Sequence, residues 1–196
     1  TGITAFSLTI PSILKNALFA QSGAKGTPDI VALKGGNNPG DLFYKGINEI
    51  GGMRRFVRQG KTVLVKPNIG WDRSASFGAN TNPDLVEAVI SECYKAGASK
   101  VYVFDHTCDG WQGCYKNSGI EAAVKKAGGE LVPASSESYY IKTEIPKGKL
   151  LKQAHVHKLY LQCDTIINVP VLKHHSSTTL TASMKNLMGV VMDRSE

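Results

Sequence analysis

Short, continuous apolar runs alternate with stretches of helical periodicity along most of the chain. The apolar runs predict strands at residues 30–33, 62–65, 100–104, 130–133 and 165–171, and the periodic stretches predict helices at 42–57, 82–95, 115–127 and 178–190. Strands that lack polar alternation and are separated by helices are typical of a mostly parallel sheet covered on both faces. The pattern therefore predicts an α/β fold with a doubly wound, Rossmann-like sheet.

Turn-forming residues refine this picture. Asn82-Pro83 offers a cap followed by a proline at the first helical position, which favours a helix start there. Residues 140–145 and 149–152 flank Pro146-Lys147-Gly148, and this arrangement predicts a small β-hairpin insertion. Residues 155–161 predict a short helix.

The first residues do not resemble the rest of the chain. Residues 3–20 are mildly apolar and rich in Thr and Ser, and small residues follow at Ser22 and Ala24. This pattern indicates the back half of a secretory signal, and its weak hydrophobicity is typical of twin-arginine signals. The alternative is a short amphipathic first helix, and Pro11 within the run argues against a long one. The apolar run is also interrupted too often for a stable membrane span.

We therefore expect residues 1–24 to be a signal-peptide remnant of an exported, periplasmic or cell-envelope protein. Residues 29–196 are interpreted as a single α/β domain whose C-terminal part is missing.

Composition and charge indicate a globular domain and argue against a nucleic-acid-binding protein. Hydrophobic residues make up 42% of the chain and charged residues 20%, as in ordinary globular domains. The formal net charge is +7, but the basic residues are scattered, and no basic run is interleaved with aromatics. Nucleic acid is therefore not expected as a partner. The excess charge is either a solvated surface or an attraction for a small anionic ligand.

The cysteines do not form a metal motif. None of the four, at positions 93, 108, 114 and 163, belongs to a CxxC pair, so neither a zinc ribbon nor an iron–sulfur cluster is encoded in this segment. Cys108 and Cys114 are close enough in sequence for a disulfide, or they are inert thiols. Cys93 and Cys163 lie in apolar patterns and are expected to be buried thiols.

Polar residues gather where three predicted strands end. These clusters are Lys66-Pro67-Asn68, then Asp105-His106, and then Lys173-His174-His175 with Ser176, Ser177 and Thr178, followed by Lys185-Asn186. In parallel α/β sheets the strand ends share one rim, and ligands bind there. We therefore expect all three clusters to meet.

The third cluster is the most informative. His174 and His175 could each act as a general base or a metal ligand. Lys173, together with Ser176, Ser177 and Thr178, could bind an anion at a helix start, or the hydroxyl residues could simply cap that helix. A desolvated Lys185 could be a nucleophile or a covalent tether, or it could reach out to solvent.

The other two clusters could assist. Asp105 and His106 are either a base with its orienting partner or an Asx turn beside a surface histidine, and Lys66 and Asn68 could bind the anion. His155 and His157 are expected to diverge and not to bind a metal. Because no GxGxxG follows the first predicted strand, a dinucleotide-binding domain is not expected.

Several motifs together resemble a known family. Val63-Leu64-Val65-Lys66-Pro67-Asn68, Asp105-His106-Thr107-Cys108, and residues 168–175 with 184–189 are similar to the family called domain of unknown function 362 (DUF362), over residues 30–194. The resemblance implies frequent twin-arginine export and an association with iron–sulfur redox modules. It implies no particular reaction.

The spacing from His175 to Lys185 is also similar to one in nickel-pincer lactate racemases. That likeness implies an acid–base role for His175 and a cofactor tether at Lys185, although the Gly-rich stretch which that family places between them is absent here.

From the sequence we interpret the protein as a cofactor- or metal-dependent enzyme, its cofactor unidentified, with an anion-binding site at the strand ends. The alternative is a non-catalytic module that binds a small anion or a partner and is linked to iron–sulfur redox proteins.

Overall fold

The centre of the molecule is a four-stranded parallel sheet. The computed structural model describes residues 26–193, so the expected signal segment lies outside the described residues. The strands occur in the order β3-β2-β1-β6, with bounds β1 Thr62–Pro67, β2 Lys100–Val103, β3 Glu130–Leu131 and β6 Thr165–Val169. The prediction of a mostly parallel α/β fold is confirmed.

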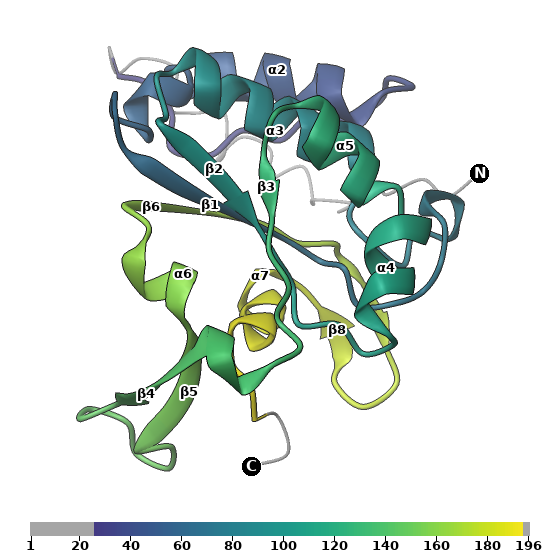
Figure 1. Ribbon diagram of the computed structural model, residues 1–196. Coiled ribbons are helices and arrows are strands. Elements are labelled where there is room, and N and C mark those ends of the chain that lie inside the picture. Colours follow the sequence, from purple (N-terminus) through teal and green to yellow (C-terminus); the bar gives the residue numbers. More distant parts are fainter. Residues whose placement is uncertain (1–25, 194–196) are drawn as a thin grey trace, which may run out of the picture.

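Helices and hairpins cover the two faces of this sheet (Figure 1). The upper face carries α2 (Pro39–Glu49), α3 (Pro83–Lys95) and α5 (Ile120–Lys126), with α4 (Trp111–Asn117) at its end. Below the sheet lie α6 (Lys158–Gln162), α7 (Ser183–Asn186) and the antiparallel hairpin of β4 (Tyr140–Glu144) and β5 (Gln153–His157). A second hairpin pairs β7 (Lys173–His175) with β8 (Thr179–Thr181).

Single turns of 3-10 helix complete the chain, at Met53–Arg55, Ala75–Phe77, Glu137–Tyr139 and Leu187–Val190. The predicted caps are present: the Asn82 side chain accepts a hydrogen bond from the Asp84 amide at 2.8 Å, with Pro83 at the first helical position. Asn38 caps α2 in the same way, accepting from the Gly40 amide at 2.7 Å. These caps satisfy amides that have no partner within the helix.

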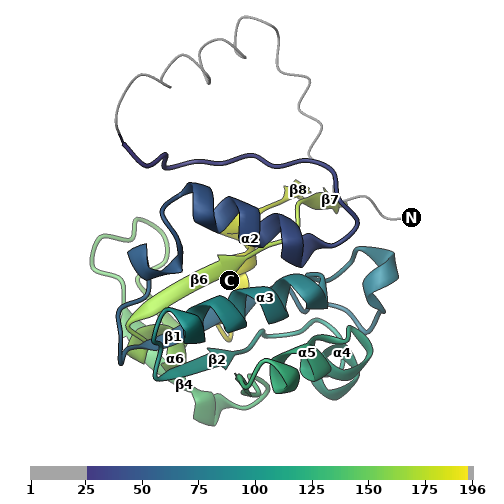
Figure 2. The ribbon, with the colours of Figure 1, turned by 90° about the horizontal axis from the view of Figure 1, so that it is seen from above.

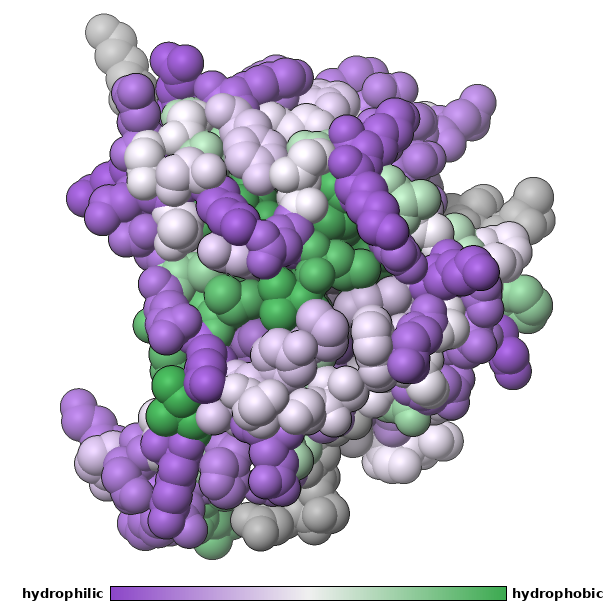
Figure 3. All heavy atoms as spheres, in the orientation of Figure 1, coloured by the Kyte–Doolittle hydropathy of each residue, from purple (hydrophilic) through white to green (hydrophobic). Residues whose placement is uncertain are grey.

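Alternate residues of β1 belong to two different cores. Val63 and Val65 pack in the upper core with α3, whereas Leu64 packs in the lower core with Phe104, and all three side chains are fully buried. Successive side chains of a strand point to opposite faces, so one short run of apolar residues stabilises both layers. Figure 3 shows further apolar side chains exposed across the face of the molecule at the level of the sheet.

Several predicted elements differ from the structure. The helix predicted at 42–57 ends at Glu49, and the second strand of the hairpin is 153–157 rather than 149–152. Residues 30–33 are unpaired and Ile30 is 82% exposed, so the strand predicted there is wrong. The helix predicted at 115–127 is two helices, because Gly119 adopts a left-handed φ of 80° between them. Residues 155–157 belong to β5 and only 158–162 are helical. The helix predicted at 178–190 is short, because the first residues form β8.

Candidate functional site

The candidate site lies where the order of the sheet reverses. The chain moves outward from β1 through β2 to β3, and β6 then lies on the other side of β1. In open α/β sheets, ligands bind beyond the carboxyl ends of the strands at such a reversal. Here β1 ends at Lys66 and Pro67, next to the Asn168 and Val169 end of β6.

A buried ion pair joins the ends of β1 and β2. Lys66 Nζ lies 2.7 Å from Asp105 Oδ1, and the two side chains are 0% and 4% exposed. The other oxygen, Asp105 Oδ2, accepts a hydrogen bond from the Ile69 amide at 2.6 Å. Lys66 and Asp105, both predicted as site residues, are thus brought together, but their charges are directed at each other and stabilise the floor of the site.

Gly189 lies directly against this ion pair. A Cβ atom added to Gly189 would stand 2.8 Å from Lys66 Nζ and even closer to Asp105 Oδ1. The His106 amide also donates to the Gly189 carbonyl at 3.3 Å. The absence of a side chain at this position therefore lets the segment after α7 close over the strand ends.

Asn186 bridges β1 and β6. Its Nδ2 donates to the Lys66 carbonyl at 3.0 Å and to Asn168 Oδ1 at 2.7 Å, while Asn168 Nδ2 donates to the Ser183 carbonyl at 2.9 Å. The buried Oδ1 of Asn186 has no hydrogen-bond partner among the described residues. Asn186, predicted as a ligand contact, is thus first a clamp that fixes α7 over the two strand ends.

Lys173 reaches the same place from the second hairpin. Its ammonium group donates to Asn68 Oδ1 at 2.7 Å and to the Ala79 carbonyl. Burial lowers the pKa of Lys173 below its usual value; Cys108 and Asp105 oppose this shift, and Lys185 adds to it. Two of the three N–H groups of the Lys173 ammonium thus have acceptors, and the third could donate to a ligand.

His175 lies on the same side of β7 as Lys173, because alternate strand residues share a face. Its Nδ1 accepts from the amides of Ser177 at 3.2 Å and Thr178 at 3.3 Å, so the neutral ring carries its proton on Nε2. The pKa of His175 is lowered by desolvation first and then by the charges of Lys185 and Lys173. In this arrangement the ring presents a hydrogen-bond donor, Nε2–H, rather than a free base.

His174 and the hydroxyl residues are placed differently. His174 is exposed on the opposite side of β7, so adjacent histidines do not converge as two ligands of one metal. Ser176, Ser177 and Thr178 form the exposed turn of the hairpin and do not cap a helix. Within residues 26–193 no group of three or more His, Cys, Asp or Glu is arranged to hold a metal ion. A metal at His174 or His175 stays a prediction.

His106 lies at the edge of the site. It is half-buried, and its Nδ1 is 3.1 Å from the Val191 carbonyl. It lines a hollow of about 250 Å³ together with Asp105, Asp109 and Ser135. His106 therefore belongs to a side pocket next to the site.

The cysteines are free thiols in the described chain. The exposed Cys108 and the buried Cys114 are both free thiols, so they do not form a disulfide with each other in the structure. Cys93 is buried and Cys163 is half-buried, and burial raises the pKa of both thiols. Cys108 lies beside Gly70, close to Asn68 and Lys173.

Three residues that shape the site are not predicted as site residues from the sequence. Asn168 lies inside a predicted strand, and its place in the motif at the end of that strand is the feature that could have indicated a role in the site. Gly189 gave no signal beyond its place in a motif. Tyr115 anchors the end of β2, since its hydroxyl accepts from the Asp105 amide at 3.0 Å and donates to the Asp105 carbonyl at 2.8 Å. Nothing in its local pattern marked that contact.

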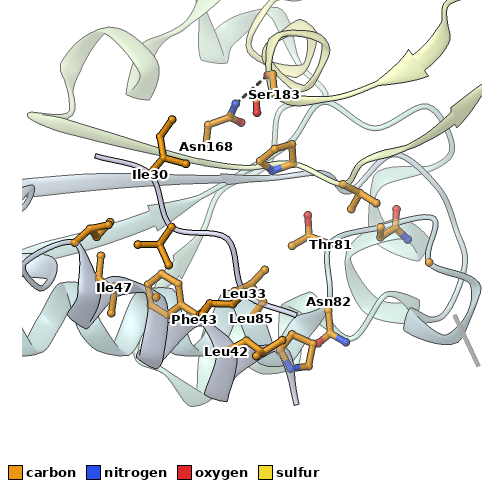
Figure 4. Close-up of a pocket in the computed structure, with 18 of the residues that line it drawn as sticks. Ile30, Leu33, Leu42, Phe43, Ile47, Thr81, Asn82, Leu85, Asn168 and Ser183 are labelled. Atoms are coloured by element: carbon orange, nitrogen blue, oxygen red, sulfur yellow. Dashed lines mark hydrogen bonds between the residues drawn. The ribbon is translucent and has the colours of Figure 1, made fainter. Parts of the chain in front are cut away.

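An apolar cleft of about 940 Å³ opens beside β6, between α2 and the Ser183 end of α7 (Figure 4). The α2 side is lined by Leu42, Phe43, Gly46, Ile47 and Ile50, and residues 29–33 lie across it. Asn168 and Ser183 lie on its β6 side, linked by the hydrogen bond drawn there. The cleft thus borders the strand-end site through the Asn168 region.

Residues 63–196, more than half of the chain, match the family described as Domain of unknown function (DUF362). The chain belongs to this family. This DUF362 protein is also similar to the thylakoid-associated protein sll1697 of Synechocystis sp. (strain ATCC 27184 / PCC 6803 / Kazusa), with 28% identity over 146 residues. That match covers 74% of this chain and 44% of the relative, so the chain spans less than half the length of the curated relative. No solved structure matches it significantly.

Among residues 26–193, no helix is both long and apolar enough to cross a membrane.

Proposed function

We propose that the crevice at the ends of β1 and β6 binds a small anionic ligand and that the protein acts on it as an enzyme. The observation that carries this proposal is the contact of Lys173 with Asn68 just after β1, with His175 on the same side of β7 and Lys185 near enough to act electrostatically on both. Within residues 26–193, neither lysine forms an ion pair. Asp105, the carboxylate that acts electrostatically on Lys173 together with the Cys108 thiol, is already paired with Lys66.

This geometry suits a carboxylate or a phosphate group. Such an anion would accept hydrogen bonds from the third donor of Lys173 and from His175 Nε2–H, and Lys185 would add its charge. A partly buried cation without a counter-charge is costly, and an anionic ligand would relieve that cost.

A cofactor is part of the same proposal. Lys185 is half-buried and acts electrostatically on Lys173 and His175, and it could hold a cofactor covalently. His174, on the outer side of β7, could serve as a metal ligand. We further propose an envelope-type location, because the relative sll1697 is described as thylakoid-associated and residues 3–20 have the composition of an export signal. An iron–sulfur protein is the proposed redox partner, on the basis of the family resemblance alone.

Calorimetric titration with inorganic phosphate and with acetate tests the anion site. We expect Lys173→Met and Lys185→Met each to weaken binding roughly tenfold or more, since a hydrogen bond to a charged group contributes about 1.5–3 kcal/mol. Lys116→Met, which removes an exposed lysine of α4, is the matched control and should bind normally. Equal affinity in all four proteins would contradict the proposal.

A single substitution separates an enzyme from a binding module. With a ligand found by titration, NMR follows its concentration over time in the presence of the protein. If the protein is an enzyme, His175→Ala slows turnover more than it weakens affinity. If it is a non-catalytic module, the native protein leaves the ligand unchanged and His175→Ala lowers affinity alone.

A further inference from the structure

The outer edge of β6 is open in the described chain. In the order β3-β2-β1-β6, β6 pairs with β1 on one side and with no strand of residues 26–193 on the other. Yet β6 is an apolar strand, Thr165-Ile166-Ile167-Asn168-Val169, and Ile166 is 37% exposed. Unpaired backbone groups along an apolar strand are a template for the addition of another strand.

The helix above this edge extends past it. Seen from above, α2 lies on the far side of β6 from β1 and β2 (Figure 2). Its residues Leu42, Phe43, Gly46, Ile47 and Ile50 recur at helical spacing and form one apolar stripe. Part of this stripe packs on the upper core, and the remainder lines the 940 Å³ cleft. The helix therefore has more apolar surface than the four strands cover.

We propose that β6 is an inner strand of the assembled protein: an extended polypeptide strand pairs with its free edge, and apolar side chains of that strand fill the cleft under α2. Parallel sheets are normally covered on both faces, and in doubly wound sheets the strand order continues outward beyond the reversal point. β6 is the first strand beyond that point, and α2 already covers the position of the next one.

The occupant is a segment of the protein's own polypeptide outside residues 26–193. The matched part of sll1697 is only 44% of that protein, so in this relative more than half of the chain is available to supply such a strand. An added strand beside Asn168 would also border the strand-end crevice, and would thus complete one wall of the anion site. The proposal itself does not depend on anion binding.

Hydrogen exchange read by mass spectrometry tests this on the protein at its natural length. We expect the peptide covering residues 165–169 to exchange as slowly as the β1 peptide 62–67, because both sides of an inner strand are hydrogen-bonded. Amides on an open edge would exchange faster by on the order of a hundredfold or more. Fast exchange of about half the β6 amides would overturn the proposal. Protection lost on dilution to monomer would also overturn it, by assigning the edge to a second copy.

A pair of tryptophan substitutions on α2 gives an independent reading. Leu42→Trp places a larger side chain in the cleft, and Lys45→Trp places the same group on the exposed side of the helix. If a strand fills the cleft, Leu42→Trp lowers the melting temperature of the natural-length protein by several degrees and Lys45→Trp does not. Equal melting temperatures of the two variants would show that the cleft is vacant and would contradict the proposal. Phosphate binding is measured separately, so its loss or persistence does not decide this proposal.

Discussion

At the scale of single residues, the Lys66–Asp105 ion pair has a structural role that the sequence alone does not reveal. Both residues follow apolar strands, where ligand contacts are expected. In the structure each neutralises the other in a fully buried position, and Ile69 and Gly189 close around them. The proposed anion site relies instead on three residues from a later part of the chain, Lys173, His175 and Lys185.

The buried pair yields a stability prediction. Asp105→Asn leaves the Lys66 ammonium buried without its counter-charge, so we expect a loss of about 3–5 kcal/mol in the free energy of unfolding. The double variant Lys66→Met/Asp105→Asn removes both charges and should recover much of that loss. Urea denaturation followed by circular dichroism measures all three proteins. A double variant less stable than Asp105→Asn would show that the pair is not the cause.

At the scale of elements, regular packing was predictable and local exceptions were not. The periodic, capped helix α3 and the apolar strand β1 have bounds close to those predicted, because local preference and burial agree. The segment 178–190 reads as a helix, but Thr179 has a positive φ of 61° and begins a strand that pairs with β7. The turn at residues 176–178 folds this segment back on the strand directly before it, and the helical spacing of the apolar residues does not show that turn.

In the candidate site, too, the positions of residues were predictable from the sequence but their contacts were not. The three polar clusters converge as parallel topology requires, so their positions were predictable from the strand ends. Their roles were not, since the partner of Asp105 is 39 positions away in the sequence and the Nδ1 contacts of His175 depend on the hairpin turn. Chemistry at the rim depends on which groups pair with each other, and this is decided only by packing.

The strand β5 carries a histidine that should make stability depend on pH. His157 is 1% exposed and stacks on Phe104 with ring centroids 3.7 Å apart. Its Nδ1 accepts from the Leu159 amide at 3.2 Å and so caps α6. Burial, the largest cause, lowers the pKa of His157 to about 4 from a usual value of 6.5. Protonation would place a hydrogen on Nδ1 and abolish the cap.

The direction of the pH dependence of stability follows from the lowered pKa of His157. Above pH 6.5 the ring is neutral in both states and its contribution to stability is complete; as the pH falls from 6.5 to 4, only the unfolded state gains a proton. We expect a loss of roughly 3 kcal/mol across that window, measured as urea midpoints at several pH values. His157→Asn, which can still cap, should flatten the dependence, whereas His155→Gln on the same strand should preserve it. An unchanged slope in His157→Asn would contradict this origin.

At the scale of the whole molecule, β1 couples the two layers of the fold. Its alternate side chains belong to the upper and lower cores, so a defect in one layer weakens the strand that the other layer needs. The upper core contains the Val63 and Val65 side chains, with Trp111 packed against it, and the lower core contains Leu64. The two layers should therefore unfold as one cooperative unit.

Leu64→Ala tests this coupling, because the cavity is made in the lower core while Trp111 reports on the upper one. Leu64 is 0% exposed, and removing its side chain should cost about 3–5 kcal/mol. The exposed Trp71 is replaced in a Trp71→Phe background, so that fluorescence follows Trp111 alone. We expect the Trp111 midpoint and the circular-dichroism midpoint to shift together. Leu161→Ala, at a 46% exposed position of α6, should shift both far less. A Trp111 midpoint that stays in place while the circular-dichroism midpoint falls would mean that the layers unfold separately, and that β1 does not transmit stability between them.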